Sequence, residues 1–201
     1  MSDKYHHGDL RNALIEEGIK MINTGGEESL SMRKLAEKCG VTMAAPYAHF
    51  KNKEDMFFCL VKDTLDAFHS VTAGSIDQME TECEYNPFDV DWAMFWVDFI
   101  FEHYDGVKLL ICCAKGSAYE NFEEDLIRKE AEADREYANI LRSSGRMEKE
   151  ISDMQWHILA TAYVHLIFEV VRHDMTREEA AEHMQFVRDL LYPGWKQIYG
   201  L

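Results

Sequence analysis

The segment SMRKLAEKCGVTMAAPYAHFKNK, residues 31–53, decides the fold class of this chain. Ser31 is a residue type that caps helices, and apolar residues then recur at helical spacing. Gly40 suits the left-handed backbone of a sharp turn, and Thr42 suits the cap of a second short helix that runs to His49. Two helices joined by a short turn form the unit whose second helix enters the major groove of DNA. The segment therefore predicts a helix-turn-helix in a DNA-binding protein.

The region around this segment resembles a known family. The matching sequence runs from Tyr5 to about Phe58. It carries Gly-Val-Thr in the turn, Tyr-x-His-Phe after it and Lys-Glu at the start of the next helix, at residues 40–42, 47–50 and 53–54. This pattern resembles the DNA-binding domain of TetR/AcrR-type transcriptional regulators. The rest of the chain is similar to that family only in its size, its helical pattern and a few features near its C-terminal end.

The resemblance implies which residues contact DNA. The start of the second helix would face the groove with small or methyl-bearing side chains, which suit contact with thymine methyl groups. Other side chains would hold phosphates, which position a protein without reading the base sequence. The candidate base contacts are Thr42, Met43, Ala44 and Ala45, and the candidate phosphate contacts are Tyr47, His49 and Lys53, with Arg33 reaching the backbone or a base edge. Packing is an equally good interpretation of His49.

Pro46 departs from the aliphatic residue that is common at its position in the family. A proline here removes a helical hydrogen bond and crowds the carbonyl group of Thr42. We therefore expect an irregular first turn, and which of residues 42–45 contact bases stays open.

Composition and charge limit the other possibilities. The 201 residues are 47% hydrophobic and 29% charged, as in ordinary soluble proteins. The polar N-terminus predicts no secretory signal, and no apolar run approaches the ~20 residues of a membrane helix. The five cysteines lack metal-ligand spacing, so we expect a cytoplasmic protein without metal or cofactor.

The charge is distributed unevenly. Residues 1–53 hold 8 Lys/Arg and 7 Asp/Glu, whereas the remaining chain holds 13 Lys/Arg and 30 Asp/Glu, within a total net charge of −16. This asymmetry fits a small cationic DNA-binding part on an acidic body that would repel the duplex elsewhere. Alternatively, the surface acids only keep the protein soluble.

The hydrophobic pattern predicts an all-α fold of about nine helices. We expect a three-helix DNA-binding domain over residues 1–52, followed by a helical effector-binding and dimerisation domain over residues 53–201. A long helix capped by Asn52 would connect the two. Further helices are predicted over about residues 89–103, 107–115, 120–141, 149–172 and 177–198.

The middle of the chain is rich in aromatic residues. By family resemblance this region binds a small effector that loosens the grip on DNA, although the same residues would also make an ordinary core. The candidate ligand-binding residues are Trp92, Trp96, Phe99, Cys112, Tyr119, Phe122 and Tyr163. Carboxylates beside aromatic faces favour a cationic apolar ligand. The carboxylates near these residues in the sequence are Asp98, Glu102, Glu120 and Glu169.

The last two predicted helices carry more apolar residues than one neighbouring helix covers. By family resemblance, two such helices from each subunit form a four-helix dimer interface. The candidate interface residues are Ile158, Ala162, Leu166, Val187, Leu191 and Trp195. A two-fold dimer would pair two DNA-binding domains with a palindromic operator whose half-sites lie about one turn (~34 Å) or a multiple apart. The alternative is that both helices are buried within one subunit.

These observations favour a ligand-responsive transcriptional regulator, which in most members of the family is a repressor. The alternative is a dimeric helical interaction module that no longer binds DNA. An enzyme is the weakest interpretation, because the chain has no G-x-S-x-G, phosphate-binding loop, dinucleotide fingerprint or H-E-x-x-H motif.

Overall fold

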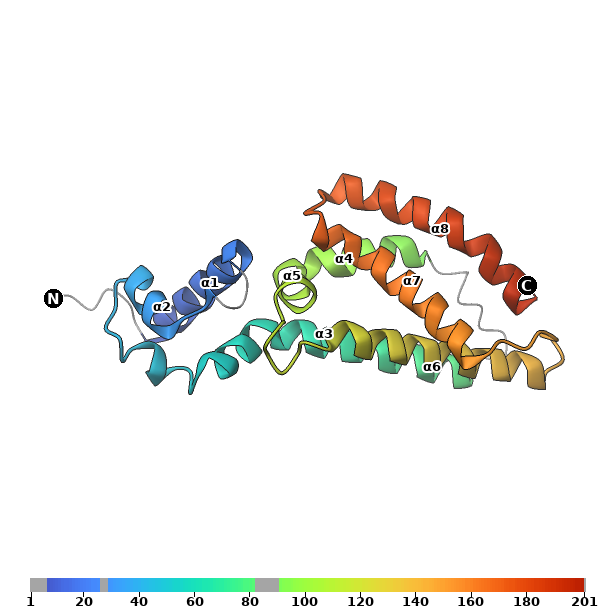
Figure 1. Cartoon of the computed structure of the whole chain (residues 1–201), viewed down its shortest axis with the longest axis horizontal. Coiled ribbons are helices and arrows are strands. Elements are labelled where there is room, and N and C mark those ends of the chain that lie inside the picture. The colour runs from blue at the N-terminus through green and yellow to red at the C-terminus, as the bar shows by residue number, and fades with distance from the viewer. Residues whose placement is uncertain (1–6, 26–28, 82–90, 201) are drawn as a thin grey trace. The chain divides into compact units, whose positions relative to one another are not determined.

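The computed structural model describes residues 7–25, 29–81 and 91–200, with side chains over residues 10–25, 29–71 and 91–200. Every regular element in this part of the chain is helical (Figure 1), which confirms the predicted all-α fold. The elements are α1 (His7–Gly25), α2 (Met32–Cys39), the short 3-10 helix η2 (Pro46–Ala48), α3 (Lys53–Thr81), α4 (Trp92–Glu102), α5 (Tyr104–Cys112), α6 (Phe122–Ser143), α7 (Asp153–Arg172) and α8 (Arg177–Tyr199). None of these described helices has the length and hydropathy needed to cross a lipid bilayer.

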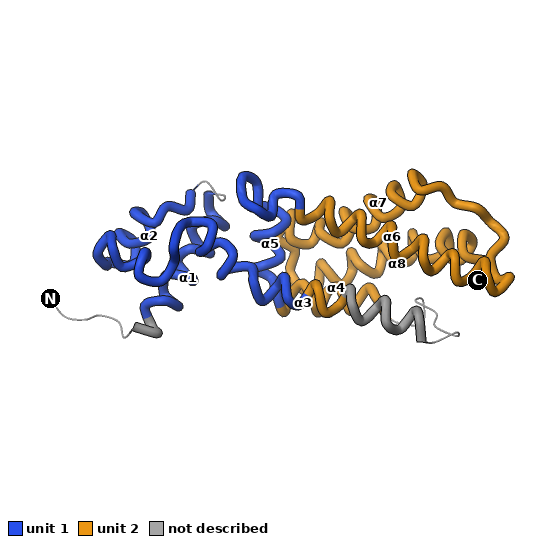
Figure 2. Tube along the Cα trace, turned by 90° about the horizontal axis from the view of Figure 1, so that it is seen from below, with its two compact units in different colours: residues 1–67, 103–121 blue, residues 68–102, 122–201 orange. Residues whose placement is uncertain are grey.

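The chain divides into two compact units, which Figure 2 distinguishes by colour. Unit 1 comprises residues 1–67 and 103–121, and unit 2 comprises residues 68–102 and 122–201. The first part of α3 and all of α5 therefore belong to the unit that contains α1 and α2. This structural division differs from the functional boundary expected at residue 52. That functional boundary stays a prediction.

The core of unit 1 is built from apolar side chains that recur at helical spacing. At most 1% of each of these side chains is exposed: Leu14 and Ile22 from α1, Leu35 from α2, and Met56, Phe57 and Val61 from α3. Phe50 closes this core from the segment between η2 and α3. The core fixes where the turn after α2 is presented.

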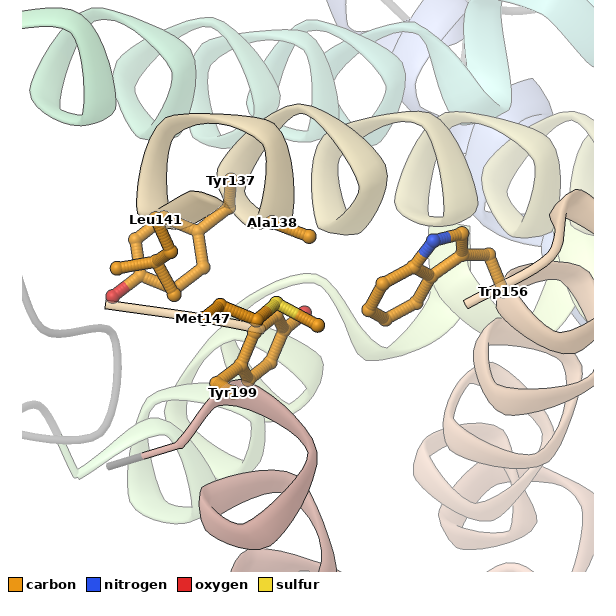
Figure 3. Packing of buried hydrophobic residues seen from close by; sticks show 6 residues of the cluster. All are labelled: Tyr137, Ala138, Leu141, Met147, Trp156 and Tyr199. Carbon is orange, nitrogen blue, oxygen red and sulfur yellow. The ribbon is translucent and has the colours of Figure 1, made fainter. Parts of the chain in front are cut away.

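Unit 2 is a bundle in which α6 packs on α7 and α4 packs on α8. One of its buried clusters joins α6, α7, the loop between them and the end of α8, and consists of Tyr137, Ala138, Leu141, Met147, Trp156 and Tyr199 (Figure 3). Both α7 and α8 begin with a capping box, formed by Ser152 with Gln155 and by Thr176 with Glu179. These boxes satisfy the backbone N–H groups at the starts of the two helices.

Candidate functional site

The turn after α2 has the geometry that the sequence predicts. Gly40 adopts a left-handed backbone with φ of 67° and donates its N–H to the carbonyl of Glu37 at 3.1 Å. The next residue, Val41, donates to Ala36 at 2.9 Å, so the last carbonyl groups of α2 are satisfied. Ser31 precedes α2 with extended backbone as expected, but its hydroxyl makes no capping hydrogen bond.

The second element of the motif differs from the prediction. Instead of an α-helix capped by Thr42, a turn closes when Ala45 donates its N–H to the carbonyl of Thr42 at 2.9 Å, and η2 follows. The carbonyl of Pro46 then accepts from His49 at 3.0 Å and from Phe50 at 2.9 Å. Pro46 has no N–H to donate to the preceding turn, which explains why regular α-helix does not form there. The irregular first turn expected from this proline is present.

Most of the candidate DNA-contacting side chains are accessible. Met43 and Tyr47 are each 56% exposed. Among the other candidates, the exposed residues are Arg33, Thr42 and Ala44, and the half-buried residues are Ala45, His49 and Lys53. The His49 ring lies 6.3 Å from that of buried Phe50, so its ring is partly engaged in packing.

A side-chain cap fixes the backbone at the start of α3, next to Lys51 and Lys53. The Asn52 side-chain oxygen accepts the N–H of Asp55 at 2.7 Å, which confirms the predicted cap. In return, the Asp55 carboxylate accepts the N–H of Lys51 at 2.9 Å. Because Lys53 is the first residue of α3, its backbone position is set by this cap.

The seven candidate ligand-binding residues do not all belong to one unit. Cys112 is exposed and Tyr119 stacks on the rings of Phe57 at 6.1 Å and Phe58 at 6.5 Å, all within unit 1. The other five, which belong to unit 2, are Trp92, Trp96, Phe99, Phe122 and Tyr163.

Two aromatic groups of unit 2 contain these five residues. In the first, the Tyr163 ring lies 5.4 Å from Trp92 and 5.0 Å from Trp195, and the Tyr163 hydroxyl accepts the indole N–H of Trp96 at 2.8 Å. In the second, the Phe68 ring contacts Phe99 at 4.7 Å, Phe122 at 5.2 Å and Phe168 at 6.2 Å. Aromatic faces thus gather on α4 and α7, as ligand pockets and ordinary cores both require.

The carboxylates that the sequence suggested as ligand partners have other roles. Asp98 pairs with Arg177, and Glu169 contacts Arg172 at 3.3 Å and His173 at 2.9 Å. The two remaining candidates are exposed: Glu120, which accepts the N–H of Gly116 at 3.2 Å, and Glu102. Because these four groups are paired or at the surface, the structure does not bring them to the aromatic groups.

Two carboxylates that the sequence reasoning missed lie one turn apart on α6. Glu130 and Asp134 are half-buried, and the Tyr199 hydroxyl donates to Asp134 at 2.7 Å. Burial raises the pKa of Glu130, and repulsion by Asp134 raises it further. Burial also raises the pKa of Asp134, against the opposing effect of the Tyr199 hydrogen bond. The missed signal was periodicity, since both acids share a helix face with apolar Ile127, Tyr137 and Leu141.

The outer faces of α7 and α8 carry large exposed apolar side chains. Met154 and Ile158 on α7 are 66% and 57% exposed, and Phe186 and Leu190 on α8 are 64% and 58% exposed. The predicted residue Ala162 is also exposed, whereas Leu166, Leu191 and Trp195 are half-buried. Val187 is fully buried inside unit 2, so its side chain offers no surface to a partner. The apolar residues of α8 occupy two faces, and the outer one contains Phe186 and Leu190.

Known proteins resemble the part of the chain that contains the helix-turn-helix. Residues 14–59 fit the sequence model described as bacterial regulatory proteins of the tetR family. This match shows that the helix-turn-helix part of the chain is similar to the DNA-binding domain of that family. The tetracycline repressor protein class C of Escherichia coli is 38% identical over 60 residues, covering 30% of this chain and 27% of that protein. A Staphylococcus aureus HTH-type transcriptional regulator is 33% identical over 58 residues, covering 29% of this chain and 31% of that protein.

Solved structures extend the likeness in fold over most of the chain. NalD, the secondary repressor of the MexAB-OprM multidrug efflux pump in Pseudomonas aeruginosa, has a TM-score of 0.59 at 14% identity, covering 96% of this chain and 98% of that one. FadR from Bacillus subtilis, solved with stearoyl-CoA, has a TM-score of 0.58 at 14% identity, covering 94% and 98%. The matches to the curated relatives above span less than half of their lengths.

Proposed function

We propose that this chain is a ligand-responsive transcriptional regulator that represses its target by binding a palindromic operator as a homodimer. The observation that carries the proposal is the helix-turn-helix over residues 31–53, which lies inside the family match at residues 14–59. A chromosome-binding protein of this kind works in the cytoplasm and needs neither a cofactor nor catalysis.

The two parts of the motif have different tasks in this proposal. The turn before η2 presents Met43 and Thr42 to base edges, where methyl groups suit thymine. Tyr47 in η2 and Lys53 at the start of α3 hold phosphates, and Arg33 reaches the backbone or a base edge. Because the element is short, the motif reads few base edges and depends more on its phosphate contacts.

The exposed apolar residues of α7 and α8 support the homodimer. Met154, Ile158, Phe186 and Leu190 are each more than half exposed, and a second copy would cover them by two-fold symmetry. Such a dimer sets the distance between two DNA-binding domains, as a palindromic operator requires.

Release from DNA would follow from a small effector bound in unit 2. The fold neighbour FadR was solved with stearoyl-CoA and NalD is a repressor, which supports an effector and a repressing role for this chain. α3 is the element through which a change in unit 2 would reach the DNA-binding part, because it contributes residues to both units. The effector would change the spacing of the two DNA-binding domains and so shift the DNA-binding equilibrium.

The test is fluorescence anisotropy of the purified protein on duplexes from upstream of its own gene, titrated across salt concentrations. We expect tight, sequence-preferring binding that weakens as salt rises. Lys53→Gln should lower affinity on all duplexes and reduce the salt slope by about one. Lys129→Gln, which makes the same charge change at an exposed position of α6, is the matched control. Equal binding to random DNA, or none, would favour the interaction module instead.

A further inference from the structure

Two carboxylates share the inward face of α6. Glu130 and Asp134 are one helical turn apart, and both act electrostatically on Tyr163 of α7 and on Tyr199 of α8. The Tyr199 hydroxyl donates to Asp134 at 2.7 Å, and the Tyr199 ring stacks on Trp156 at 5.7 Å. These five residues, which we call the acidic-aromatic cluster, come from three helices of unit 2.

The acidic-aromatic cluster contains carboxylates and aromatic rings but no lysine or arginine. Burial and the charge of Asp134 raise the pKa of Glu130, and burial raises the pKa of Asp134 against the opposing hydrogen bond from Tyr199. The arginines nearest in sequence are engaged elsewhere, Arg128 with Asp125 at 2.8 Å and Arg135 with Asp153 at 3.4 Å. The sequence of residues 72–90 contains no lysine or arginine. Two half-buried carboxylates without a cation repel each other unless protons or a bound cation neutralise them.

A second observation points to a ligand at the same place. Trp156 is 1% exposed, yet its indole N–H finds no hydrogen-bond partner among the described residues. Figure 3 shows that this nitrogen lies on the ring edge that faces α6. A buried donor without an acceptor costs free energy, and a bound molecule that carries an acceptor would recover it.

Aromatic faces next to the carboxylates favour one sign of charge. Tyr163 meets Trp92 at an interplanar angle of 80° and Trp195 at 77°, so the Tyr163 ring packs edge to face with both indoles. The faces of aromatic rings attract cations, and they do so most strongly where water is excluded. Charge, ring faces and the free donor are therefore complementary to one molecule that combines a cation, an apolar body and an acceptor.

We propose that the acidic-aromatic cluster binds an organic cation, an amine or quaternary ammonium with an apolar body and a hydrogen-bond acceptor, through Glu130 and Asp134. This inference rests on the proposed function in that such a cation would be the effector. The carboxylates neutralise the ligand's charge, the ring faces cover its apolar body, and the Trp156 indole N–H donates to its acceptor.

The test compares two molecules of the same shape that differ in charge. Benzoylcholine carries a trimethylammonium group and an ester carbonyl, and 3,3-dimethylbutyl benzoate replaces that group with an uncharged tert-butyl group. Binding is followed by tryptophan fluorescence without DNA, so a failure of DNA binding does not affect the result. We expect benzoylcholine to bind at least about ten-fold more tightly to the wild-type protein.

Variants separate recognition from structure. Glu130→Gln and Asp134→Asn should abolish the preference for the charged molecule, whereas Glu136→Gln, at an exposed position of the same helix, should keep it. Glu130→Gln should also leave the melting temperature of the free protein unchanged or higher, because the neutral side chain removes repulsion. Equal binding of the two molecules, no binding of benzoylcholine, or an unchanged preference in Glu130→Gln would overturn the proposal. If DNA binds the protein but benzoylcholine does not release it, while the preference for the charged molecule persists, only the role of the cation as effector is contradicted.

Discussion

Replacing Gly106 with alanine should destabilise the protein, although alanine is normally the better helix former. Gly106 lies in α5 and faces Thr64 of α3, a buried polar residue of unit 1. A methyl group at this position would overlap the Thr64 hydroxyl and lie 2.8 Å from its Cβ atom. The Cβ atom of Thr64 is fixed to the α3 backbone and cannot rotate away, so α5 must move.

The size of the effect follows from that distance. Carbon atoms pack at about 3.5–4.0 Å, so α5 and α3 must separate by roughly 1 Å. Overpacking of this kind costs about 1–3 kcal/mol, against a gain of up to about 1 kcal/mol from replacing glycine in a helix. We expect a net loss of about 1 kcal/mol, or a melting temperature roughly 2–4 °C lower.

The assay is thermal unfolding of the wild-type protein, Gly106→Ala, Thr64→Ala and the double variant. Thr64→Ala removes the overlapping hydroxyl, so the double variant should recover part of the loss and the two changes should not be additive. The cycle therefore isolates the contact between α5 and α3 from the general effect of each substitution. A Gly106→Ala variant as stable as the wild-type protein, or more stable, would refute this account of the packing.

Three further outcomes are expected. Because the folded-state pKa of Glu130 is raised to about 8, the folded protein holds more protons than the unfolded chain, and its stability should fall as pH rises from about 4.5 to about 8. In thermal melts, the stability of the Glu130→Gln variant should fall less steeply with rising pH than that of the wild-type protein. Leu190→Lys should convert the proposed dimer to a monomer in size-exclusion chromatography with light scattering. Val187→Ala should keep that dimer and cost about 2 kcal/mol of stability. Asn52→Ala should cost about 1 kcal/mol in thermal unfolding because Asp55 loses its acceptor, and Asn52→Asp should retain the cap.

Local chemistry explains which parts of the fold were predictable. Gly40 is needed for a positive φ, and Asn52 is followed by Asp55 at capping distance, so both features depend only on residues nearby in the sequence. The irregular turn before Pro46 follows equally from the missing N–H of that residue. Such signals are self-contained, and the structure agrees with each of them.

Features that depend on distant contacts could not be predicted in the same way. Apolar residues on α8 form two faces, and only packing against α4 and α7 decides that Val187 lies inside while Leu190 lies outside. Glu130 and Asp134 stand in a highly charged stretch of α6, where acids ordinarily face water. That α5 packs with α1 and α3, through Gly106 and Thr64, has no signal near either residue.

The arrangement of α7 ties the proposed effector site to the proposed dimer face. Trp156 and Tyr163 point inward to the acidic-aromatic cluster, whereas Met154, Ile158 and Ala162 on the same helix are exposed. A cation that draws Glu130 and Tyr163 together would shift α7 against α6, and a rigid helix cannot move its inner face without moving its outer one. Effector binding and the geometry of the dimer would then be coupled through one helix. If so, a monomeric Leu190→Lys variant should still bind benzoylcholine but should lose the coupling between that binding and DNA release.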